Sequence, residues 1–182
     1  MWRLRLISWP FVLGLIIVTG CGPNHRYYSK QNIKLSAGLR HGQASYYDLQ
    51  IGTPTQPFDQ NLDAYGDVVV ELSENDVVAL ADLTVADLLK ASTKTTNLDE
   101  VGYDTGWPKG SQRITVGRRI FAVVNQDRIL GLDANSVGLR QGERAPRFGR
   151  KGSVDLYAMP LNQEQVLEIF GEPDKQNDVL HN

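Results

Sequence analysis

The sequence predicts an α+β domain built mainly on an antiparallel sheet, with two short helices at about residues 84–91 and 162–170. Short runs rich in β-branched residues recur along the chain, separated by glycine, proline and asparagine, which is typical of strands joined by turns. These two segments combine a capping residue with helical spacing of apolar side chains. The length of 182 residues, with 41% hydrophobic and 22% charged residues, suits one ordinary domain plus extensions. A single Cys excludes an internal disulfide framework.

The first 20 residues have the pattern of an export signal. Arg3 and Arg5 precede an apolar stretch at 6–18, in which a proline and a glycine make a permanent membrane span unfavourable. The stretch ends in Val18-Thr19-Gly20-Cys21, which resembles the bacterial lipobox. The resemblance implies diacylglyceryl attachment to the Cys21 sulfur, cleavage before Cys21 and, usually, acylation of the new amine. The alternative is a transmembrane anchor with an incidental cysteine.

The lipobox resemblance also implies a location and a first partner. Two or three acyl chains would hold the protein stably on a membrane, so we expect contact with the membrane through the lipid on Cys21. In Gram-negative lipoproteins an Asp after the Cys favours the inner membrane, and Gly22 stands there instead, which favours the outer membrane. We therefore expect a bacterial cell-envelope protein that faces the periplasm. The near-neutral formal charge of −2 gives no reason to expect nucleic-acid binding.

The mature chain is expected to begin with a tether and then form one domain. Residues 21–43 are polar and lack a sustained apolar period, which predicts a flexible tether after the lipidated Cys. The single α+β domain is expected over residues 44–174, followed by a C-terminal tail at 175–182. Within the domain, an apolar-leaning run at 46–51 leads into a Pro-, Gln- and Asp-rich loop at 52–63.

The middle of the chain predicts strands, the first helix and a long loop. The β-branched run at 67–72 predicts a strand, whereas residues 73–83 fit either a capped helix or a short strand. Thr84 can cap the helix that ends near residue 91, with Asp87 suited to its first turn and Lys90 to its last. The segment 92–110, rich in Thr, Asn and Gly, predicts a long loop.

The second half of the chain predicts a hairpin and further strands. The apolar runs 113–116 and 118–124 form one arm, with Gly117 as a bulge, and 128–132 forms the other across a short polar link. Segments 136–139 and 154–159 are plausible strands. The segment between them, residues 140–151, carries five basic residues. It is either a solvated loop, which its glycines and proline favour, or a contact for anionic headgroups, lipopolysaccharide phosphates or an acidic partner.

The second helix has the most complete set of local signals. Asn162 at the N-cap and Gln165 at the third position form a capping box, and Gly171 suits a left-handed end. The pattern Leu-Asn-x-Glu-Gln-Val-Leu-x-x-Phe-Gly-x-Pro-Asp, residues 161–174, resembles the first-helix motif of the SmpA/OmlA-type lipoproteins, accessory subunits of the outer-membrane barrel-assembly machinery. That family places strands after this motif, whereas only residues 175–182 follow it here. The simpler interpretation is a helix packed on the sheet.

Catalytic motifs are largely missing from the sequence. The three His residues are too dispersed to favour a Ser-His-Asp triad or a multi-histidine metal site, and no cofactor-binding fingerprint occurs. The run 46–58 resembles the strand and loop before the first catalytic aspartate of pepsin-like proteases, with Asp63 in that place, but Ala64-Tyr65 follow it where the family has Thr/Ser-Gly. Asp104-Thr105-Gly106 is an intact triplet in a polar loop. Aspartic catalysis needs two carboxylates sharing a proton, so a chain of this length would have to dimerise.

The sequence thus predicts a non-enzymatic lipoprotein without a cofactor or metal, which binds an envelope protein or polymer as an accessory subunit of an envelope complex. The alternative is a dimeric aspartic-protease-like hydrolase. The best candidate contact surface is the loop at 93–110, because Tyr103 and Trp107 are aromatic residues flanked by glycine. Trp107 is also the only tryptophan outside the expected signal. Equally, Trp107 could fold under its loop as a plug.

Overall fold

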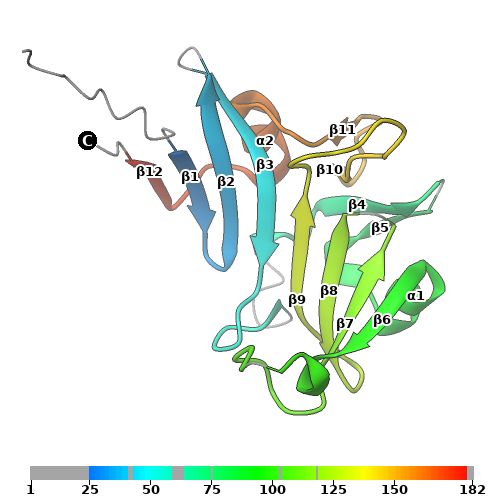
Figure 1. Ribbon diagram of the computed structural model, residues 1–182. Helices are drawn as coiled ribbons and strands as arrows, with labels where there is room; N and C mark the ends of the chain where they lie inside the picture. Colours follow the sequence, from blue (N-terminus) through cyan, green and yellow to red (C-terminus); the bar gives the residue numbers. More distant parts are fainter. Residues whose placement is uncertain are drawn as a thin grey trace, which may run out of the picture.

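Two antiparallel sheets and two short α-helices make up the protein (Figure 1). The computed structural model describes residues 25–40, 43–58, 64–74, 76–102, 104–117 and 119–179. The predicted α+β class, mainly antiparallel sheet with two short helices, is confirmed.

The larger sheet contains eight strands in the order β12-β1-β2-β3-β9-β8-β7-β6. Its strands are β1 (His25–Lys30), β2 (Ile33–Arg40), β3 (Gln43–Ile51), β6 (Ser92–Asn97), β7 (Gln112–Val116), β8 (Ile120–Asn125), β9 (Arg128–Asn135) and β12 (Lys175–Val179). Strands β1 to β3 and β6 to β9 are two meanders, which join where β3 pairs with β9 and Leu49 lies opposite Ala134. This long-range pairing creates one continuous sheet from two local units.

The smaller sheet has four strands in the order β11-β10-β4-β5. Its strands are β4 (Val68–Ser73), β5 (Asp76–Ala79), β10 (Arg147–Arg150) and β11 (Leu156–Ala158). Together with helix α2 (Gln163–Phe170) it lies on one side of the larger sheet (Figure 1). The buried side chains of Leu49 and Leu132 in the larger sheet and of Val70 and Phe148 in the smaller one belong to a single hydrophobic core. We call the opposite side of the larger sheet its outer face.

Both helices begin and end as the sequence predicts. Helix α1 (Val85–Lys90) starts with a capping box, in which Thr84 accepts a hydrogen bond of 3.2 Å from the amide of Asp87. In α2 the Asn162 side chain accepts from the amide of Gln165 at 2.9 Å, and the Gln165 side chain accepts in return from the amide of Asn162 at 2.9 Å. Gly171 ends α2 with φ 78°, a left-handed conformation that favours glycine.

Two segments predicted to be irregular are strands of the larger sheet. The expected tether at 21–43 is wrong from His25 onward, because β1 and β2 occupy most of it, and the expected tail at 175–182 begins with β12. In β2 the cause is clear: alternate residues such as Ile33 and Leu35 are fully buried, whereas Lys34 between them faces solvent. Polar residues at every second position concealed the apolar side of this strand.

The other element predictions hold in part. The strands predicted at 67–72 and 154–159 overlap β4 and β11, and the hairpin across Gln126 and Asp127 is confirmed as β8 and β9. The apolar-leaning run at 46–51 lies in β3. The expected loop at 92–110 instead starts with β6, and residues 77–83 form the end of β5 followed by the 3-10 helix Leu80–Asp82. Gly117, with φ 56°, lies in a turn between two antiparallel strands, β7 and β8, and is not a bulge. The expected strand at 136–139 is a turn after β9.

Candidate functional site

The outer face of the larger sheet is turned toward the viewer in Figure 1, with no helix or strand in front of its centre. Polar residues of β3 and β9 lie on this face. On β3, Asp48 and Gln50 alternate with buried residues. On β9, Asp133 and Asn135 do the same. Because β3 and β9 pair antiparallel, Asp133 lies opposite Gln50 and Asp48 lies opposite Asn135. The four polar side chains therefore share one patch of the outer face.

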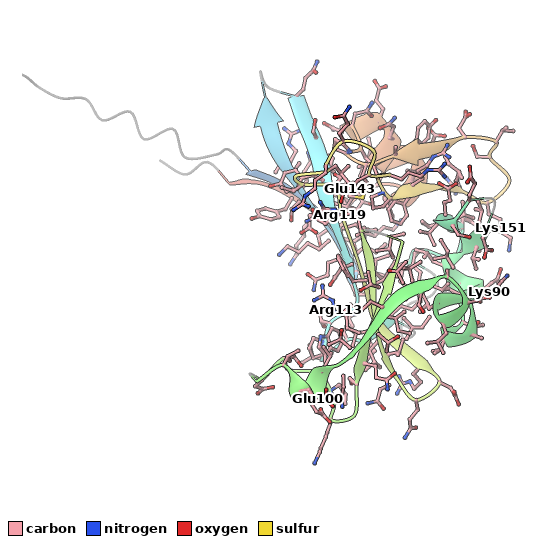
Figure 2. All side chains as sticks on the ribbon, turned by 45° about the vertical axis from the view of Figure 1, so that its right-hand side comes forward. Lys90, Glu100, Arg113, Arg119, Glu143 and Lys151 are labelled. Carbon is pink, nitrogen blue, oxygen red and sulfur yellow. The ribbon has the colours of Figure 1, made fainter. Side chains whose placement is uncertain are left out.

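Two residues from neighbouring strands complete a shallow cavity in this patch. Phe121 on β8 lies opposite Asp133, and the guanidinium of Arg113 on β7 lies 4.3 Å from the centre of the Phe121 ring. Figure 2 shows Arg113 beside the middle of the larger sheet. The cavity has a volume of about 280 Å³. We define the outer-face site by its lining residues: Asp48, Gln50, Arg113, Phe121, Asp133 and Asn135.

Asp133 is the electrostatically unusual residue of the outer-face site. The pKa of its carboxyl is raised from 3.8 to about 6, first by burial and then by repulsion from Asp48, while Arg113 acts in the opposite direction. Among the described residues, none donates a hydrogen bond to this carboxylate or forms an ion pair with it. The Asn135 amide instead donates to the Asp48 carboxylate at 3.4 Å and accepts from the backbone amide of Val137 at 2.7 Å. Asp133 is thus a half-buried acid without a hydrogen-bond donor of its own.

Trp107, a predicted contact residue, lies at the border of the outer-face site. Its indole packs over Gly131 so closely that a Cβ added there would lie 2.9 Å from Trp107 Cη2. It closes a second small hydrophobic cluster with Leu98, Val123 and Leu130, and is half-buried. Gly131 and Asp133 are two positions apart on β9 and share a face, which places their Cα atoms about 7 Å apart. The half-buried indole thus packs against the sheet, as expected if Trp107 folds under its own loop. Tyr103 lies outside the described residues.

The basic segment 140–151 pairs internally with the smaller sheet and its flanking residues. Its ion pairs are Arg144–Glu74 at 3.1 Å, Arg147–Glu71 at 3.4 Å, Arg150–Asp67 at 3.4 Å and Lys151–Asp82 at 3.4 Å. The acidic partners lie in or next to β4 and in the 3-10 helix after β5. These pairs neutralise most of the segment's charge, which favours a solvated structural role over contact with an anionic surface.

A second cavity, of about 260 Å³, lies between the end of β4, the β7–β8 turn and residues 142–146. Its floor includes the buried residues Val116 and Ile120. At its side the Arg119 guanidinium forms an ion pair of 3.1 Å with Glu143, and both labelled side chains lie side by side in Figure 2. The same Arg119 nitrogen donates to the carbonyl of Gly138 at 3.0 Å. Because Arg119 is engaged within the protein, this cavity is a weaker candidate than the outer-face site.

The structure does not describe a pair of carboxylates at Asp63 and Asp104, the two residues considered for aspartic catalysis. Asp63 lies outside the described residues. The exposed Asp104 accepts a hydrogen bond of 2.8 Å from the amide of Gly106, which makes the Asp-Thr-Gly triplet a local turn. Within the described ranges, no group of three or more His, Cys, Asp or Glu side chains could hold a metal ion.

Sequence reasoning did not identify Asp48, Asp133 or Arg113. Strand alternation could have assigned the two aspartates to the polar side of their strands, but not to the same cavity, because the pairing of β3 with β9 joins segments more than 80 residues apart. No family model, curated protein or solved structure matches the chain. None of the helices in the described part is long and apolar enough to cross a membrane. Cys21 and the expected signal lie outside the described residues.

Proposed function

We propose that this protein is a lipid-anchored, periplasm-facing envelope lipoprotein that acts as a non-enzymatic binding or accessory subunit of an envelope complex. We further propose that it contacts its partner through the outer-face site. One observation carries this proposal: the outer face of the sheet holds an open cavity with a half-buried carboxylate, Asp133, to which none of the described residues donates a hydrogen bond. Burial of an ionisable group costs folding free energy, and such groups concentrate at functional sites.

The chemistry of the outer-face site supports recognition of another molecule. Arg113 stacked on Phe121, with Trp107 nearby, supplies the residue types that most often dominate the binding energy of protein interfaces. Asp48 and Asp133 add directional acceptors. The side chains project from paired strands, so binding them requires little ordering of backbone.

The location rests on the N-terminal residues alone. The lipobox resemblance at Val18-Thr19-Gly20-Cys21 supports acylation of Cys21, and Gly22 supports sorting to an outer membrane if the cell has one. We expect metabolic labelling with a palmitate analogue to label the unmodified protein and not a Cys21→Ser variant. Equal labelling of both would contradict the lipid anchor.

Site-specific photocrosslinking in intact membranes tests the contact surface. A photoreactive residue at position 121, in the outer-face site, should give a discrete crosslinked product. The same residue at position 154, where Val154 is 98% exposed, serves as the control and should not give that product. Products that are identical at both positions, or occur at neither, would refute this surface. No contact of Asp104 favours the hydrolase alternative, so we do not propose it.

A further inference from the structure

We propose that the outer-face site binds a cationic side chain of the partner protein, a lysine ammonium or an arginine guanidinium, between Asp48 and Asp133. This inference rests on the proposed function, since it names the chemistry by which the same surface recognises its partner. The occupant is deduced from charge, spacing and the nature of the surrounding walls.

The two carboxylates are spaced to share one cation. Asp48 lies opposite Asn135 on the neighbouring strand, so Asp133 is its diagonal neighbour on the same face. Diagonal residues of an antiparallel pair have their backbones about 7–8 Å apart, and side chains reach across this distance. One ammonium or guanidinium can bridge the gap, because each charged hydrogen bond spans about 2.8 Å.

The charge of the cavity favours a cation. Two carboxylates face it, Asp48 from β3 and Asp133 from β9, and the only positive group among its lining residues is Arg113 from β7. Arg113 lies over the Phe121 ring, and in the described part of the chain it forms no ion pair with Asp133. When both acids are ionised, the cavity therefore has a net negative charge that one bound cation would balance.

The walls of the cavity suit the rest of a long basic side chain. The partly exposed Phe121 lines the cavity, and Trp107 packs over Gly131, two positions from Asp133 on β9. Lysine and arginine place their aliphatic stems along apolar or aromatic surface while the charged end reaches polar groups. Gln50 also lines the cavity, and its amide can bond to the partner's backbone or side-chain termini.

Binding of a cation at this position should weaken in acid. The pKa of Asp133 is about 6, raised first by burial and then by Asp48, while Arg113 lowers it. Phe121 on β8 adds no charge, so Asp48 and Arg113 are the charged groups lining the cavity with Asp133. Below pH 6 Asp133 is mostly protonated and the cavity loses one of its two acceptor charges.

The test uses a defined probe and Trp107 as the reporter. The full chain, in detergent, carries Trp2→Phe and Trp9→Phe so that Trp107 is the sole tryptophan. It is titrated with Nα-acetyl-lysine methylamide, and with the uncharged norleucine analogue as the control ligand. We expect a saturable change in Trp107 fluorescence for the lysine probe at pH 7.5, and no saturable change for norleucine.

Variants and pH then identify the acceptor groups. Asp133→Asn and Asp48→Asn should each weaken the lysine probe about tenfold, the loss of one charged hydrogen bond. Lowering the pH from 7.5 to 5 should weaken it about fivefold, because most of a group with a pKa of about 6 is then protonated and the protonated form binds about tenfold more weakly, and only when Asp133 is present. Asp127→Asn, in the exposed β8–β9 turn, is the matched control and should leave the affinity unchanged.

Three results would overturn the inference. The first is equal affinity for the lysine and norleucine probes, and the second is unchanged affinity for the lysine probe in Asp133→Asn. The third is displacement of the lysine probe by Ca²⁺ at equal concentration and constant ionic strength, which would indicate a metal site. Crosslinking distinguishes this failure from failure of the proposed function. A specific product from position 121 without lysine binding would leave the contact surface standing, whereas lysine binding without such a product would refute the surface as the partner contact.

Discussion

Replacing Asp133 by Asn should stabilise the protein at neutral pH. The substitution keeps the shape of the side chain and removes a charge that burial disfavours. The pKa of Asp133 is raised from 3.8 to about 6, and each unit corresponds to about 1.4 kcal/mol, so its ionisation costs the fold about 3 kcal/mol. Partial exposure of the carboxylate to water reduces this cost, and we expect a gain of about 2–3 kcal/mol.

The pH dependence gives this prediction its sign. A raised pKa means that the native state binds the proton more tightly than the unfolded state. The contribution of Asp133 to stability is therefore most favourable below pH 4 and falls as the pH rises from about 4 to about 6. Above pH 6 the full cost is present. Asp133→Asn should thus gain its 2–3 kcal/mol at pH 7 and about nothing at pH 3.5.

Urea and thermal unfolding, followed by circular dichroism, measure the effect. For a chain of this size the expected gain corresponds to a rise in Tm of about 5–10 °C at pH 7. Asp48→Asn should give a smaller gain, because repulsion from Asp48 is the second cause of the shift. Asp127→Asn, on the exposed turn, should stay within about 0.5 kcal/mol. An Asp133→Asn variant that is no more stable at pH 7, or equally stabilised at pH 3.5, would refute the reasoning.

Three further substitutions test the packing. Asn162→Ala removes the side chain that accepts from the Gln165 amide, and should lower the free energy of unfolding by about 1 kcal/mol in urea titrations, whereas Asn162→Ser should preserve it. Gly131→Ala places a Cβ 2.9 Å from Trp107, so the indole must move; we expect red-shifted Trp107 fluorescence and a loss of about 1–3 kcal/mol, and an unchanged spectrum would contradict the contact. In a double-mutant cycle with alanine, Arg144 and Glu74 should couple by less than about 1 kcal/mol, because both side chains are more than 70% exposed; a coupling above about 2 kcal/mol would contradict a solvated pair.

If Asp133→Asn is more stable and also fails to bind the lysine probe, stability and recognition oppose each other at one residue. Such opposition is expected where a binding site holds a group that folding alone would not favour. The same variant then links the two experiments, because loss of binding cannot be attributed to loss of folding.

The elements that could be predicted from the sequence are those held by local contacts. Thr84 and Asp87 are three residues apart, as are Asn162 and Gln165, so each capping box is visible in the sequence and present in the structure. The β8–β9 hairpin across Gln126 is another local unit. The location implied by Cys21 depends on the N-terminal sequence alone and stays a proposal.

The elements that were missed depend on distant partners. Strand β1 pairs with β12 across the length of the chain, with Tyr28 opposite Gln176, and neither strand has a strong apolar pattern. A mixed polar sequence becomes a strand here because neighbouring strands supply its backbone hydrogen bonds. The basic residues of segment 140–151 likewise form ion pairs with acidic residues in β4 and in the 3-10 helix after β5. No spacing within the segment itself could indicate these partners.

The candidate site follows the same division. Trp107 was identified in the sequence as the only tryptophan outside the expected signal, in a glycine-rich loop, but only the tertiary structure placed its indole on Gly131. Asp48 and Asp133 look like ordinary polar strand residues until β3 and β9 pair and place them on one face. Capping and hairpin formation need only residues a few positions apart, whereas the cavity needs a strand register set by burial of both sheets in one core.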